Sequence, residues 1–143
     1  MKSPKYLPDV NVLVGITDQN HIHHVTATEW FNTPGLEWGI CPFTEAGLLR
    51  MSANPAVGRL TVEEASMLVE QLTRRRGCRF WPLTKSWGEL VSPFAERIYG
   101  HRQIANAFLL GLAIKENGVL VSFDKAIRSL AGPKFSGNVL ILE

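Results

Sequence analysis

Short apolar runs alternate with longer segments of helical periodicity along this chain, and this alternation restricts the possible folds more than any other feature. The clearest run is VLVSF, residues 119–123, which follows a helical segment and ends at Asp124. A short apolar run without polar alternation is typical of a strand that is buried on both faces of a sheet. Strands that alternate with helices predict an α/β fold with a mostly parallel sheet covered on both faces.

Turn and cap residues set the expected bounds of these elements. Pro8 is unfavourable inside a central strand, so the first strand should end near Asp9. Asn20 is a possible cap of the first helix, and Thr61 with Glu64 has the spacing of a capping box. We expect strands near residues 6–9, 38–41, 79–83, 119–123 and 139–142, and helices over residues 21–31, 42–54, 62–76, 86–98, 103–116 and 125–132.

Length and composition predict one ordinary globular domain over residues 1–143. The chain is 45% hydrophobic and 20% charged, with a net charge of +2 that is compatible with a polyanionic partner but does not require one. It has no signal-peptide pattern and no apolar run of membrane-spanning length, so we expect a soluble cytoplasmic protein with no membrane partner. Cys41 and Cys78 have neither the spacing of a zinc site nor that of a disulfide framework.

Acidic residues follow two of the expected strands. The carboxyl ends of parallel strands share one edge of a sheet, where ligands bind, so Asp9 and Asp124 are expected to meet there. Glu45, in the first turn of a helix that follows a strand, points toward the same edge. Three carboxylates without a neutralising lysine or arginine repel one another, and a divalent cation relieves this repulsion. Arg102 is expected at the rim of the same site, where it can contact phosphate.

The same acidic residues have a simpler interpretation. Asp9 and Asp124 can be helix N-caps and Glu45 a favourable first-turn charge, with no metal at all. From spacing alone, both interpretations stay open. His21, His23 and His24 place at most two imidazoles on one helical face, which favours solvated or capping residues over metal ligands.

Four segments, LPDVNVLVG, CPFTEAGLLR, GHRQIANAFLLGLA and VLVSFDKAI, occur in this order over essentially the whole chain. Together they resemble the PIN-domain ribonucleases, particularly the VapC toxins of toxin-antitoxin pairs, and the stretch from His21 to Trp30 fits one VapC subgroup. The resemblance implies a three-layer α/β/α fold whose acidic pocket holds magnesium or manganese and cleaves RNA. It also implies a VapB-type antitoxin that covers the pocket, and a homodimer.

The resemblance assigns site residues by position. It implies acidic roles for Asp9, Glu45 and Asp124, with Asp9, Asn106 and Asp124 as metal ligands. It also implies that Asn11, Thr44 and Ser122 support the pocket. Ligands of this hard oxygen type hold such a metal together with several waters, one of which becomes the nucleophile.

Asn106 departs from the family pattern, which normally has an aspartate there. The Asn106 carbonyl can still ligate a metal, but the lost negative charge should lower metal affinity and water activation. Two explanations are open: a naturally weakened family member, or a deliberate Asp→Asn change that silences a toxic enzyme, which the otherwise intact motif favours. In a simpler interpretation, Asn106 is a polar residue that hydrogen-bonds locally near a helix start.

The sequence leaves several functions open. The first is a metal-dependent endoribonuclease toxin, and the second is a catalytically silent module that binds RNA or its antitoxin. A receiver-like phosphoacceptor domain expects a second acid beside Asp9, and the sequence has none there. Nucleotide enzymes of the dinucleotide and P-loop kinds are disfavoured because neither GxGxxG nor GxxxxGK[ST] occurs.

Overall fold

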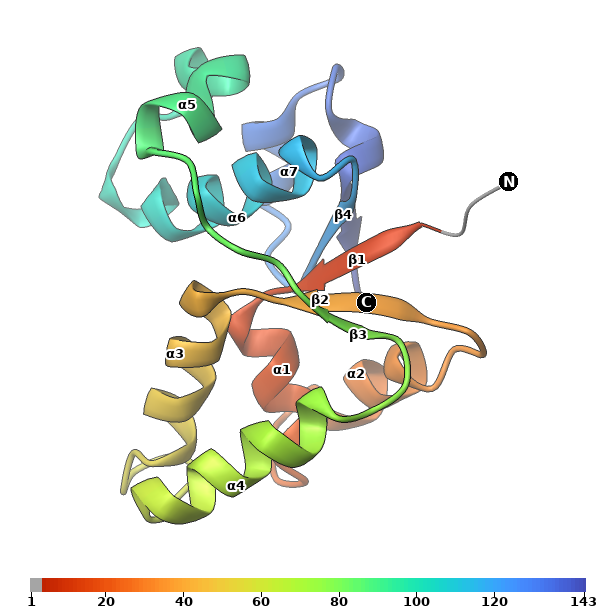
Figure 1. Cartoon of the computed structure of the whole chain (residues 1–143). Helices are drawn as coiled ribbons and strands as arrows, with labels where there is room; N and C mark the ends of the chain where they lie inside the picture. Colours follow the sequence, from red (N-terminus) through yellow and green to blue (C-terminus); the bar gives the residue numbers. More distant parts are fainter. Residues whose placement is uncertain (1–3) are drawn as a thin grey trace.

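One parallel sheet forms the centre of the molecule. In the computed structural model, which describes residues 4–143, all the strands pair in parallel in the order β3-β2-β1-β4-β5 (Figure 1). The predicted mostly parallel sheet is confirmed. The strands are β1 Lys5–Pro8, β2 Glu37–Ile40, β3 Cys78–Phe80, β4 Val119–Ser122 and β5 Val139–Ile141.

Helices cover both faces of this sheet. In Figure 1, α1 to α4 lie below the sheet and α5 to α7 lie above it, so the predicted three-layer α/β/α architecture is confirmed. The helices are α1 Val10–Thr17, α2 His24–Phe31, α3 Pro42–Ser52, α4 Val62–Thr73, α5 Trp87–Val91, α6 Ile104–Lys115 and α7 Ile127–Ala131. Short 3-10 segments span Ser92–Arg97, His101–Gln103 and Ser136–Asn138. No helix among residues 4–143 combines the length and apolarity that crossing a membrane requires.

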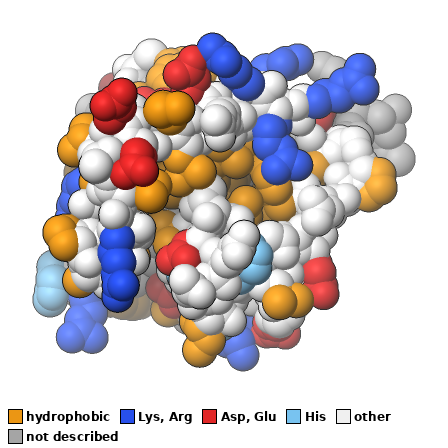
Figure 2. Space-filling model, turned by 90° about the horizontal axis from the view of Figure 1, so that it is seen from below, with side chains coloured by type: hydrophobic (Ala, Val, Ile, Leu, Met, Phe, Trp, Pro, Cys, Tyr) orange, Lys and Arg blue, Asp and Glu red, His pale blue; other side chains and the backbone are white. Residues whose placement is uncertain are grey.

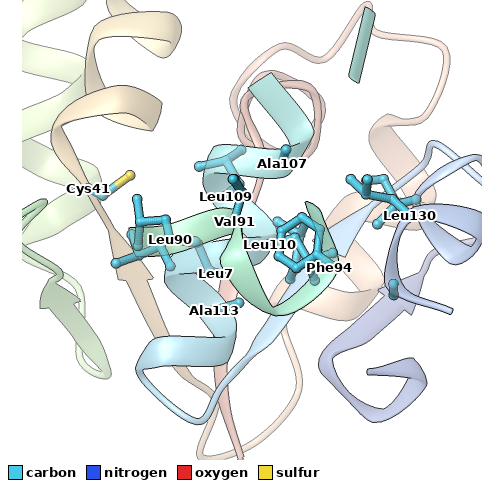
Figure 3. Close-up of a cluster of buried hydrophobic side chains, with 14 of the residues drawn as sticks. Leu7, Cys41, Leu90, Val91, Phe94, Ala107, Leu109, Leu110, Ala113 and Leu130 are labelled. Carbon is cyan, nitrogen blue, oxygen red and sulfur yellow. The ribbon is translucent and has the colours of Figure 1, made fainter. Parts of the chain in front are cut away.

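The strands contribute to two hydrophobic cores, one on each face. Leu7 and Leu120 pack with residues of α5, α6 and α7 in the first core (Figure 3). Trp38 and Val121 pack with α1 to α4 in the second. Adjacent strand residues point to opposite faces of a sheet, so Leu120 and Val121 anchor different helical layers. Each fully buried side chain of this size contributes roughly 2 kcal/mol of transfer free energy.

Helix α1 was missed by the sequence analysis, which expected no helix before residue 21. The segment VNVLVGIT is buried over five consecutive residues, Val12 to Ile16, so it carries no polar face from which helical periodicity is visible. The predicted helix over residues 21–31 begins only at His24, with His23 at the N-cap position. The cap prediction for Asn20 was wrong, because the Asn20 N–H donates to the Asp18 carboxylate (2.9 Å) within a turn.

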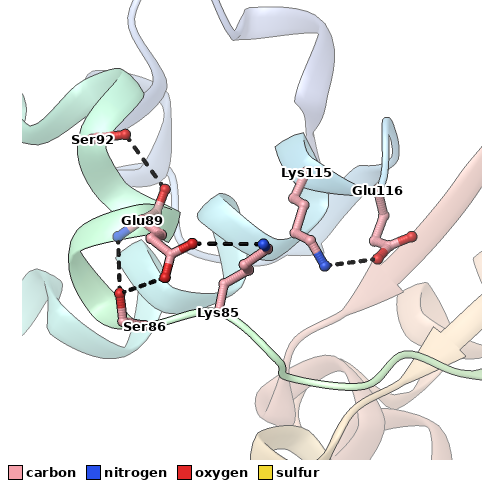
Figure 4. A network of polar contacts seen from close by, with 6 residues as sticks. All are labelled: Lys85, Ser86, Glu89, Ser92, Lys115 and Glu116. Carbon is pink, nitrogen blue, oxygen red and sulfur yellow. Dashed lines mark hydrogen bonds and ion pairs between the residues drawn. The ribbon is translucent and has the colours of Figure 1, made fainter.

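The expected helix over residues 86–98 is divided in two. Helix α5 ends at Val91 and a 3-10 segment containing Pro93 continues the chain, because proline lacks the N–H that an α-helix needs. Ser86 caps α5 by accepting the Glu89 N–H (3.3 Å), and Lys85 pairs with the Glu89 carboxylate (3.6 Å; Figure 4). Helix α4 has the predicted capping box: Thr61 accepts the Glu64 N–H (3.0 Å) and donates its own N–H to the Glu64 carboxylate (2.9 Å).

The strand order determines where a ligand crevice lies. From β1 the chain adds β2 and β3 on one side, and later β4 and β5 on the other. Connections that leave neighbouring strands in opposite directions open a crevice beyond their carboxyl ends. Strands β1 and β4 are such neighbours: Asp9 directly follows β1, and Asp124 stands two residues after the end of β4.

Candidate active site

Asp9 stands where β1 ends and α1 begins. Its Oδ1 accepts the Val12 N–H (2.9 Å), which caps α1, and its Oδ2 accepts the Ser122 hydroxyl (2.5 Å). Its backbone N–H donates to the Val121 carbonyl (2.9 Å), which continues the pairing of β1 with β4. The side chain is only 8% exposed. The carboxylate is therefore held in one orientation by both neighbouring elements. The N-cap interpretation of Asp9 is correct, and it leaves room for a second role.

Ser122 and Asp124 connect the end of β4 to this carboxylate. The fully buried Ser122 hydroxyl accepts the Asp124 N–H (3.0 Å) while it donates to Asp9. The exposed Asp124 accepts the Ala126 N–H on Oδ1 (3.0 Å) and the Asn106 Nδ2–H on Oδ2 (3.1 Å). One hydrogen-bonded network thus joins the ends of β1 and β4 to the first turn of α6.

The electrostatics of the site favour a positive charge. Burial raises the pKa of the Asp9 carboxyl above its ordinary 3.8, and the negative charge of Asp124 raises it further. Hydrogen bonds from Ser122 and Val12 oppose these effects by stabilising the ionised form. A proton or a bound cation relieves the cost of this buried charge.

A hollow of about 270 Å³ opens over these side chains, and we call it the acidic pocket. Its lining contains no lysine, arginine or histidine. The polar atoms are carboxylate, amide and hydroxyl groups, the ligand type that magnesium and manganese prefer. The lining residues are Asp9, Val10, Asn11, Phe43, Ala105, Asn106, Leu109, Ser122 and Asp124.

The oxygen ligands of the acidic pocket fit a divalent cation, but only two of them are negatively charged carboxylates. Within residues 4–143, no group of three or more His, Cys, Asp or Glu side chains is arranged to hold a metal ion. The pocket has two carboxylates, Asp9 and Asp124, with the neutral Asn106 beside them. A cation here would bind two anionic ligands and one amide oxygen.

Glu45 and Thr44 lie beside the acidic pocket rather than in its lining. Glu45 is half-buried in the first turn of α3, and Phe43 of the same turn lines the pocket instead. The buried Thr44 hydroxyl accepts the Cys41 N–H (3.0 Å) and donates to the Cys41 carbonyl (3.2 Å). Thr44 therefore fixes the start of α3, and the functional roles of both residues stay predictions.

Arg102 is exposed in the 3-10 turn His101–Gln103 that leads into α6. The predicted phosphate contact is compatible with this place, four residues before Asn106, and it stays a prediction.

The sequence analysis missed a link between Asn11 and His21. The exposed Asn11 lines the acidic pocket, and its Oδ1 lies 3.0 Å from His21 Nε2. The His23 ring stacks on the ring of Phe123, with centroids 4.3 Å apart. Phe123 is the residue between Ser122 and Asp124 in the sequence. Without α1, nothing in the spacing indicates that residues 11 and 21 meet. The available signal was the histidine-rich stretch itself, which we expected to be solvated or capping.

The chain is similar to known proteins over most of its length. Residues 6–133 match the family model described as PIN domain. Ribonuclease VapC38 from Mycobacterium tuberculosis (strain ATCC 25618 / H37Rv) is 38% identical over 128 residues, which cover 87% of this chain and 89% of that protein. Ribonuclease VapC44 from the same strain is 32% identical over 130 residues, covering 89% and 91%.

Two solved structures share the fold at low sequence identity. VapBC2 from Rickettsia felis, bound to a DNA fragment from their promoter, superposes with a TM-score of 0.66 at 14% identity, covering 97% of this chain and 99% of that one. VapBC-1 from nontypeable Haemophilus influenzae has a TM-score of 0.53 at 16% identity, covering 87% and 89%. These likenesses support the fold alone.

Proposed function

Because the chain belongs to the PIN-domain family and to its VapC ribonucleases, we propose that it is the toxin of a VapBC-type toxin-antitoxin pair. Its activity is endonucleolytic cleavage of RNA phosphodiester bonds in the cytoplasm, with magnesium or manganese as cofactor. The observation that carries this proposal is the network that joins Asp9, Ser122, Asp124 and Asn106 at the crevice between β1 and β4.

In this proposal the polar residues in and beside the acidic pocket divide the work among them. Asp9, Asn106 and Asp124 would hold the metal, which when bound supplies an activated water and stabilises charge on the phosphate. Ser122 and the Val12 N–H fix the Asp9 carboxylate, so little reorganisation is needed on binding. In this proposal Glu45 adds negative charge from α3, and Arg102 contacts the RNA backbone from the rim.

Asn106 weakens this site. Its Nδ2–H donates to Asp124, so the hydrogen bond satisfies a carboxylate oxygen that a metal would otherwise take. A carboxylate at position 106 would instead repel Asp124, and this repulsion would raise the affinity of the pocket for a cation. The same hydrogen bond supports the alternative function, a silent PIN module that binds RNA or its antitoxin without cleavage.

One experiment separates the active enzyme, the weakened enzyme and the silent module. The chain and its Asn106→Asp variant are incubated with a mixed RNA pool in manganese, in magnesium and in chelator. We expect metal-dependent cleavage by the Asn106→Asp variant that is at least about tenfold faster than cleavage by the parent chain. If neither protein cuts RNA under any metal, the nuclease proposal is wrong and the binding-module function takes its place.

We also propose a VapB-type antitoxin as partner, because the similar solved structures are VapBC2 and VapBC-1.

A homodimer is a further expectation, for which the apolar residues of α4 are a candidate interface. Val62 and Met67 of α4 are 72% and 53% exposed. Figure 2 views the molecule from below and shows hydrophobic side chains in a hollow between charged ones. Light scattering of the Met67→Glu variant tests this interface: a dimer that persists unchanged excludes α4 from it.

A further inference from the structure

Two side chains of the acidic pocket already donate a hydrogen bond within it. The Ser122 hydroxyl donates to Asp9, and one of the two Nδ2–H groups of Asn106 donates to Asp124. Asn11 is the remaining side-chain donor of the lining, and its Nδ2 has no hydrogen-bond partner among residues 4–143. A site rich in carboxylates that must also accept a phosphate needs a donor for the phosphate oxygens. Asn11 is the lining side chain whose donor group has no partner at all among residues 4–143, so both of its N–H groups are free to provide this donor.

His21 determines which end of the Asn11 amide is available. A backbone N–H can only donate, so the His23 N–H that lies 3.0 Å from His21 Nδ1 requires a lone pair on that nitrogen. In a neutral imidazole the proton then sits on Nε2, which is 3.0 Å from Asn11 Oδ1 and donates to it. The Asn11 carbonyl oxygen is therefore held by His21, which leaves Nδ2 for the acidic pocket.

We propose that His21 is a positioning residue of this site, which holds the Asn11 amide so that its Nδ2 donates to a non-bridging phosphate oxygen of bound RNA. This inference rests on the proposed function and adds a residue to it. His21 itself does not line the acidic pocket, so it acts through Asn11.

The surroundings of His21 keep its ring in place. The centroid of its imidazole ring lies 6.4 Å from that of the stacked Phe123 ring and 5.7 Å from that of the tilted His23 ring. Behind it, a Cβ added at Gly15 would lie 3.5 Å from His21 Nδ1 and 3.1 Å from the Ala27 side chain, so the turn between α1 and α2 is closely packed. Partial burial also lowers the pKa of His21, which favours the neutral form that the bond from the His23 N–H requires.

Two variants separate positioning from mere structural support. In His21→Gln the terminal amide reaches the place of Nε2, so it keeps the donor to Asn11 but loses the acceptor for the His23 N–H. In His21→Asn the side-chain oxygen takes the place of Nδ1, so it keeps that acceptor but loses the donor to Asn11. Loop stability should follow the bond to the His23 N–H, and RNA affinity should follow the bond to Asn11.

The test measures binding of a fluorescein-labelled single-stranded RNA oligonucleotide to the full chain in Ca²⁺ by fluorescence anisotropy, with the thermal midpoint of each variant. We expect His21→Asn and Asn11→Ala each to weaken binding by at least about tenfold, the loss of one hydrogen bond to a charged group. His21→Gln should stay within about twofold of the parent, although its thermal midpoint falls below that of His21→Asn.

Equal losses in His21→Gln and His21→Asn, or losses that follow the thermal midpoints, would overturn the positioning role while leaving the proposed function intact. If the parent chain and Asn106→Asp neither bind nor cut RNA, the proposed function fails, and the role of His21 fails with it.

Discussion

Asp9 carries most of the electrostatic cost of this site. Its carboxylate is buried beside a second carboxylate, and hydrogen bonds from Val12 and Ser122 only partly compensate. Groups of this kind are kept for function at the expense of stability. A neutral residue at this position should therefore make the metal-free protein more stable.

We predict that Asp9→Asn raises the free energy of unfolding at pH 7 in chelator by roughly 1 kcal/mol. The raised pKa of Asp9 means that the folded state binds its proton more tightly than the unfolded state does. Proton binding to Asp9 therefore stabilises the folded state of the parent chain below the ordinary pKa of 3.8. This stabilisation is lost as the pH rises through the higher pKa that Asp9 has in the folded state. The advantage of Asp9→Asn should vanish near pH 3.5 and be largest at neutral pH.

Urea denaturation at several pH values measures this difference. Glu29→Gln, which removes the same charge from an exposed position on α2, is the control and should show no such pH-dependent gain. A loss of stability in Asp9→Asn at pH 7 would mean that the hydrogen bonds of the carboxylate outweigh its burial.

Among single residues, the sequence predicted that Asp9 and Asp124 lie close together, but it did not predict the contacts that support them. Asp9 and Asp124 follow strands, and parallel strands bring their ends together, so their proximity follows from pattern alone. The Asn11–His21 bond depends on the turn between α1 and α2, which no local pattern encodes. The family pattern placed Thr44 near the pocket, but it gave no sign that the Thr44 hydroxyl is bonded to the backbone of Cys41.

Among the elements, α6 carries Asn106 and must pack closely on α5. Gly111 makes this approach possible, since a Cβ there would lie 2.6 Å from the Leu90 carbonyl oxygen. The two helices enclose the first hydrophobic core together with the sheet (Figure 3). A larger residue at position 111 therefore has to push the helices apart.

We predict that Gly111→Ala destabilises the fold by about 1–3 kcal/mol through overpacking, despite the higher helix propensity of alanine. Gly88→Ala in α5 is the matched control: nothing lies within 4 Å of its Cβ, so it should be stabilising by about 0.5 kcal/mol. Thermal unfolding of both variants provides the comparison. Equal effects of the two substitutions would show that the α5–α6 approach is not tight in solution.

Element type was predictable where a local sequence signal, such as a cap or a bounded apolar run, marks the segment. The capping box of α4 and the buried-type strand β4 were both identified from local pattern. Helix α1 was not, because it is buried on nearly all sides and begins at the residue that ends β1. Its absence from the prediction is also why the histidines were expected to be merely solvated or capping.

The whole molecule brings the site together through its strand order. Alternation of strands and helices predicts a parallel sheet, but it does not determine which strands become neighbours. The order β3-β2-β1-β4-β5 places β1 beside β4, and so unites residues from the two ends of the chain. The Ser122–Asp9 hydrogen bond spans 113 residues of sequence. Metal binding at such a site should stabilise the entire fold.

Mn²⁺ binding tests most directly whether Asp9, Asp124 and the residue at position 106 together hold a divalent cation. Electron paramagnetic resonance would measure free Mn²⁺ during titration of the parent chain, Asn106→Asp, and the double variant Asp9→Asn with Asn106→Asp. We predict that Asn106→Asp binds Mn²⁺ at least about tenfold more tightly than the parent, because a third anionic ligand is added, and that the double variant loses this gain. Equal affinity in all three proteins would contradict the account, because the cation would then bind elsewhere.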